Sequence, residues 1–73
     1  MDRKDREKLD KNFALLTLEC EAVKVVNSLL ELMSFGHSRK DLESEIRSMR
    51  SHLDQIEKLY IEIRDELLKH AID

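Results

Sequence analysis

The apolar residues in the C-terminal half of the chain follow one spacing without interruption. Steps of four and three residues separate Leu42, Ile46, Met49, Leu53, Ile56, Tyr60, Ile63 and Leu67. This alternation returns to one side of an α-helix every seven residues and is typical of a helix that packs lengthwise on another helix. No stretch of useful length shows the period-2 alternation of a strand. The spacing therefore predicts a long amphipathic helix at about residues 39–71.

The N-terminal half shows the same steps on two neighbouring sides of one helix. A first seam consists of Leu9, Phe13, Leu16, Cys20, Val23, Asn27 and Leu30. A second seam consists of Leu15, Leu18, Ala22, Val25, Leu29 and Leu32. At about 100° per residue, the two seams and their neighbours cover more than half of the circumference. A helix that is apolar over so much of its surface is buried against more than one neighbour. We expect this helix at about residues 3–35.

The stretch between the two helices has the residues of a turn. The chain has no proline, and its only glycine, Gly36, suits the left-handed residue that ends a helix. Ser38 can cap the second helix, and Asp41 follows three residues later, as in a capping box with Asp in place of Glu. A linker this short makes the two helices antiparallel neighbours. We therefore predict an all-α antiparallel helical hairpin, with residues 1–73 as a single domain.

A second interpretation gives this region a binding role. Arg39, Lys40, Arg47 and Arg50 would form a basic knuckle that faces an anionic partner. The capping residues favour a plain turn, but Arg39 and Lys40 oppose the dipole of the helix they begin.

A hairpin on its own leaves one apolar seam uncovered. It has one helix–helix interface, so the first helix would bring two seams to a second helix that offers one. Each exposed Leu or Val of the surplus seam would forgo about 1.5–3 kcal/mol of burial. We take the second seam as the candidate partner-binding surface and expect either a homodimeric four-helix bundle or a complex with another helical protein. Which seam packs on the second helix stays open at this point. So does the role of Asn27, which either sets the register of the bundle or lies at the edge of the face.

Composition and motifs give no sign of catalysis or of a bound cofactor. Cys20 is the only cysteine, so no disulfide forms within the chain, and its place on an apolar seam favours a buried packing residue. His37, His52 and His70 make no metal-ligand spacing with it or with one another, so no metal site is expected. We expect a non-enzymatic protein without a cofactor.

The charge and hydropathy patterns restrict location and partners. The net charge of −3 argues against nucleic acid as a partner. No segment approaches the roughly 20 apolar residues of a membrane span. The N-terminus, MDRKDREKLD, is too charged for a secretion signal. A single cysteine fits a reducing compartment. These features together predict a cytoplasmic protein.

In layout, the chain resembles the small co-chaperones of type III secretion needle subunits, the YscE/EscE/SsaE-like family. The features that carry the resemblance are the charged N-terminus, the wide apolar helix from Phe13 to Met33, the turn SFGHSRKD and the heptad-patterned LESEIRSMRSHLDQIEKLY. The resemblance implies a cytosolic hairpin that pairs with a tetratricopeptide-like partner and helps to hold an aggregation-prone needle subunit. Two alternatives remain: a homodimeric coiled-coil adaptor or scaffold subunit, and a small regulator of a signalling enzyme.

Overall fold

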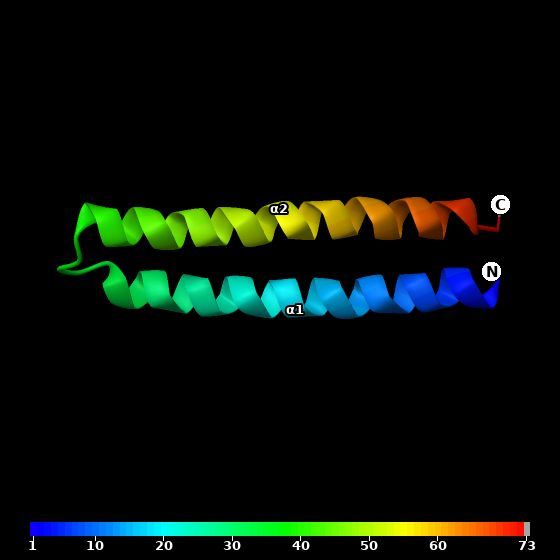
Figure 1. Ribbon diagram of the computed structural model, residues 1–73, viewed down its shortest axis with the longest axis horizontal. Helices are drawn as coiled ribbons and strands as arrows, with labels where there is room; N and C mark the ends of the chain where they lie inside the picture. Colours follow the sequence, from blue (N-terminus) through cyan, green and yellow to red (C-terminus); the bar gives the residue numbers. More distant parts are fainter. Residues whose placement is uncertain (73) are drawn as a thin grey trace.

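The computed structural model describes residues 1–72 as two long α-helices that pack side by side (Figure 1). Helix α1 spans Arg3–Met33 and helix α2 spans Arg39–Lys69. The molecule measures 54 × 17 × 15 Å. Its long dimension corresponds to one 31-residue helix, which is ~47 Å long, together with the turn. The all-α antiparallel hairpin is confirmed, and each helix ends two residues earlier than predicted. Both termini lie at the end opposite the turn (Figure 1).

Side-chain caps and one left-handed residue define the helix ends. Asp2 caps α1 by accepting a hydrogen bond from the backbone N–H of Asp5 at 2.9 Å. Ser38 caps α2 by accepting one from the N–H of Asp41 at 3.2 Å. Between the helices, Gly36 has a φ of 85°, a backbone conformation that costs residues with a Cβ but not glycine. These groups reverse the chain direction within a few residues.

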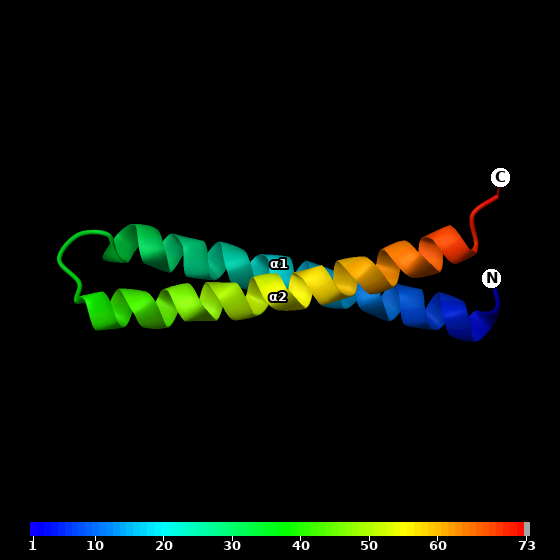
Figure 2. The same cartoon turned by 90° about the horizontal axis from the view of Figure 1, so that it is seen from above.

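The helices meet along a contact seam that differs from the predicted one at every second position. In α1 it comprises the buried or half-buried residues Leu9, Asn12, Leu16, Glu19, Val23, Val26, Leu30 and Met33. In α2 it comprises Leu42, Glu45, Met49, His52, Ile56, Leu59, Ile63 and Glu66. Seen from above, the two helices cross each other (Figure 2). Every second residue agrees with the predicted patterns, and the others lie one position earlier in the sequence. Both helices are therefore rotated relative to the expected arrangement.

This rotation brings polar side chains between the helices. Asn12 is 7% exposed, and its side-chain N–H donates to Glu62 Oε2 at 3.2 Å. Further along the seam, His52 Nδ1 lies 2.7 Å from Glu19 Oε2. Each pair joins one helix to the other, so a slip in register would separate the partners. Asn27, in contrast, is exposed at the edge of the seam, and Asn12 is the asparagine placed to set the register.

The apolar core is thin as a result. Among the described residues, only Leu9, Val26 and Ile63 are buried hydrophobic side chains. The other apolar side chains of the contact seam are half-buried. A core this small explains why covering further apolar surface would stabilise the molecule.

Candidate partner-binding surface

The second seam lies exposed along α1. Leu18 is 65% exposed and Leu32 is 76% exposed. Leu15, Val25 and Leu29 are also exposed, whereas Ala22 is half-buried. The helix α2 thus packs on half of the first seam, through Leu9, Leu16, Val23 and Leu30, and leaves the second seam to solvent.

An open hollow lies at the turn end of the second seam. It is lined by Lys24, Val25, Ser28, Leu29 and Leu32. Its lining is mainly apolar, and Lys24 and Ser28 are its two polar residues. A single large side chain from another protein would fit such a hollow better than a small-molecule substrate would, because the hollow is open to solvent.

A second apolar surface is formed by both helices together. Its residues, which we call the two-helix flank, are Phe13, Cys20, Ile46, Leu53, Tyr60 and Leu67, and all are exposed. Each of them directly follows a residue of the contact seam. Because the helices run antiparallel, the residues that follow the seam on α1 and on α2 lie on the same side of the hairpin. The flank therefore forms one apolar face that spans both helices.

The flank corrects two expectations from the sequence. Phe13 and Cys20 of the first seam do not contact α2 as core residues, and Cys20 is an exposed thiol rather than a buried packing residue. Likewise, Ile46 and Tyr60 of the predicted α2 stripe are each 55% exposed. Polar residues instead occupy four places between the helices, each one position before an apolar residue of the predicted pattern. They are Asn12, Glu19, Glu45 and His52. The rotation thus moves apolar side chains from the interface to one flank.

An arginine borders the two-helix flank at Tyr60. The guanidinium carbon of Arg64 lies 5.7 Å from the centre of the Tyr60 ring. The same guanidinium pairs with the carboxylate of Asp65 at 3.0 Å. The hydrogen bond to Asp65 is the main cause of a raised pKa for Arg64, so this residue stays charged. The flank therefore has a charged rim beside an aromatic side chain, a common composition at protein interfaces.

The hairpin exposes more surface than a compact protein of its size. A compact monomer of 8.7 kDa exposes about 4,700 Å². The hairpin exposes 6004 Å². Its elongated shape, 54 × 17 × 15 Å, accounts for a large area, and the many large apolar side chains within that area indicate a protein partner.

The basic residues around the turn belong to a mixed-charge surface. Arg39 pairs with Glu43 at 2.7 Å, and Arg50 pairs with Asp54 at 3.2 Å. Both pairs are exposed and join residues one helical turn apart. Carboxylates thus accompany two of the four residues of the suggested basic knuckle. Phe35, which is exposed in the turn, adds an apolar side chain at this end.

One further group of side chains was not predicted from the sequence. Asp5 of α1 lies beside Glu66 and His70 at the end of α2, with donor atoms within 4.8 Å of one another. Glu66 and His70 are four residues apart, a spacing that places them on one side of a helix. Asp5 joins them only because the hairpin brings the two termini together. A search for metal-ligand spacing between His and carboxylate residues, in addition to His and Cys, would have found Glu66 and His70.

Neither helix is long and apolar enough to cross a membrane within the described residues.

Comparisons of the chain with protein-family models, with curated proteins and with solved structures find no match. The assignment of this surface consequently rests on the hairpin itself.

Proposed function

We propose that this chain is a non-enzymatic interaction module that binds α-helices of another protein through its exposed apolar surfaces. The observation that carries the proposal is the exposure of the second seam and of the two-helix flank. The rotation of both helices places the flank on the outside, and the second seam stays uncovered because α2 covers only the contact seam. Burial of those side chains in a complex would contribute about 1.5–3 kcal/mol for each one fully covered.

The more specific proposal is a small co-chaperone of the type III secretion kind. Such a protein would use the second seam on α1 to bind a helical-repeat partner, and the complex would hold an export substrate that otherwise aggregates. The size of the chain, the hairpin layout and the exposed apolar face of α1 support this role. The tetratricopeptide-like nature of the partner and the needle subunit come from the family resemblance alone.

The two-helix flank favours a second candidate, a homodimer. In a four-helix bundle, each helix turns about three of every seven positions towards the core. In α2 these positions would be the contact seam together with Ile46, Leu53, Tyr60 and Leu67. Two hairpins that join through this flank would then form a four-helix bundle, as an adaptor or scaffold subunit would.

Co-purification at native expression level would test the proposal. The bait variants are the parent chain, Leu18→Glu and Thr17→Glu. Thr17 is exposed on the polar side of α1, so the second substitution adds the same charge one residue away but outside the second seam. We expect the parent and Thr17→Glu to retain a helical partner and Leu18→Glu to lose it.

The mass of the complex in solution then separates the two candidates. A defined complex with a helical-repeat protein supports the co-chaperone, and a stable dimer that recruits nothing supports the adaptor. If all three baits behave alike, the second seam is not the binding surface.

A further inference from the structure

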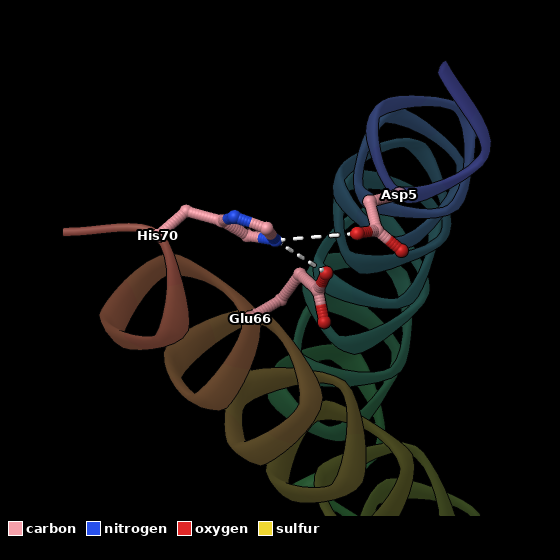
Figure 3. Close-up of side chains that lie close together, drawn as sticks. All are labelled: Asp5, Glu66 and His70. Carbon is pink, nitrogen blue, oxygen red and sulfur yellow. Dashed lines mark hydrogen bonds and ion pairs between the residues drawn. The ribbon is translucent and has the colours of Figure 1, made fainter. Parts of the chain in front are cut away.

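The cluster at the open end of the hairpin joins the first turn of α1 to the end of α2. His70 Nε2 lies 3.3 Å from Asp5 Oδ2 and 3.2 Å from Glu66 Oε1. Figure 3 shows all three side chains pointing to one place between the helix ends. Each of them is partly shielded from water, and Glu66 is the least exposed, with 14% of its side chain accessible. The three groups therefore form a small converging site and not a set of separate surface charges.

One proton does not satisfy this arrangement. The two carboxylate oxygens approach the same ring nitrogen, and that nitrogen carries at most one N–H. A single N–H points well at one oxygen and poorly at the other. A cation placed between the three atoms would accept electron pairs from all of them, and a divalent ion would also balance the charges of both carboxylates.

The two distances from the imidazole nitrogen fit the coordination shell of one particular class of ion. Zinc binds His nitrogen at about 2.0–2.1 Å and carboxylate oxygen at about 2.0–2.2 Å, usually in a tetrahedron. The edge of such a tetrahedron is about 1.63 times the bond length, or ~3.3–3.6 Å. The two distances from His70 Nε2 are 3.3 and 3.2 Å. A nitrogen ligand disfavours Mg²⁺ and Ca²⁺, which take oxygen ligands in larger numbers.

We propose that Asp5, Glu66 and His70 form a binding site for Zn²⁺ or a similar divalent transition-metal ion, with water as the fourth ligand. The ion clamps the two chain ends together at the end of the hairpin that has no covalent connection. Helix ends of this kind fray unless they are held. A small domain with a thin core gains most from such a clamp, and the site does not depend on which protein covers the apolar surfaces.

Calorimetry with zinc chloride tests the site in the untagged chain of residues 1–73. The background is Cys20→Ser, so that the only thiol does not bind the metal. We expect saturable binding of one zinc ion per chain and a melting temperature that rises with zinc and returns on chelation. Loss of outer-shell partners alone weakens metal sites about 10- to 100-fold. We therefore expect His70→Gln or Asp5→Asn to weaken binding by at least about 100-fold.

The matched control is His52→Gln, which removes an interhelical histidine that faces Glu19 and lies far from the open end. It should bind zinc as the background chain does. Circular dichroism without metal shows whether each variant remains helical, and the visible absorption of bound Co²⁺ reports tetrahedral ligation independently of stability. The proposal is overturned if the background chain does not bind zinc saturably, or if His70→Gln and His52→Gln bind it equally.

Discussion

Leu18 and Leu9 belong to one helix but have opposite environments, so paired substitutions separate folding from binding. Leu9 is 2% exposed and Leu18 is 65% exposed. Leu9→Ala removes a core side chain, and such changes cost about 2–5 kcal/mol. Leu18 gains only about a third of the 1.5–3 kcal/mol available from full burial, so its loss costs the hairpin ~0.5–1 kcal/mol. Leu9→Ala should therefore unfold the hairpin much more readily than Leu18→Glu.

The binding cost of Leu18→Glu follows from the same numbers. A partner that covers Leu18 completely gains the remaining two thirds, ~1–2 kcal/mol. Since 1.4 kcal/mol is a factor of ten, this loss alone weakens association about 5- to 30-fold. An unpaired carboxylate in the interface adds several kcal/mol of desolvation cost, so we expect a reduction beyond about 100-fold.

Two measurements test this prediction. Urea unfolding monitored by circular dichroism, at micromolar concentration, gives the stability of each hairpin. Sedimentation velocity gives its association, alone or with the co-purified partner, and Thr17→Glu is the charge-matched control. The reasoning is refuted if Leu18→Glu loses as much stability as Leu9→Ala, or if it associates like the control.

Three further substitutions test the turn and the contact seam through the melting temperature. Gly36→Val places a β-branched residue at a φ of 85°, so it should cost at least about 1–2 kcal/mol; an unchanged melting temperature would contradict the left-handed role of Gly36. Ser38→Ala removes the cap of α2 and should cost about 0.5–2 kcal/mol, whereas no loss would mean that its hydrogen bond to Asp41 contributes nothing. Asn12→Leu should raise the melting temperature, because a buried Asn sets register at a cost in stability; a lower value would show that the bond to Glu62 is net stabilising.

The elements of this fold were predictable from spacing alone. Long runs with steps of four and three residues indicate helices whatever covers them, and the residue types of Gly36 and Ser38 mark the reversal. The C-terminal end of each helix was predicted two residues too late. In α1 the helix ends at Met33, and Phe35 and Gly36 belong to the turn. Terminal residues carry the weakest periodic signal.

The rotation of the helices was not predictable from apolar spacing. From Leu9, a step of three residues leads to Asn12 and a step of four leads to Phe13, and both steps keep the helical period. Hydrophobicity alone selects Phe13. The hairpin instead places Asn12 between the helices, where its side chain donates to Glu62 of α2, and a residue fifty positions away is invisible to a local pattern. The cluster of Asp5 with His70 was missed for the same reason.

Photocrosslinking from single positions of α1 tests the central claim most directly. A photoreactive amino acid is placed at Leu29, in the exposed second seam, or at Glu21, on the polar side of the same helix, and the chain is irradiated in its native host. The account predicts a discrete crosslinked protein from position 29 and none from position 21. Equal products from both positions, or no product from position 29, would show that the exposed apolar seam does not bind a partner.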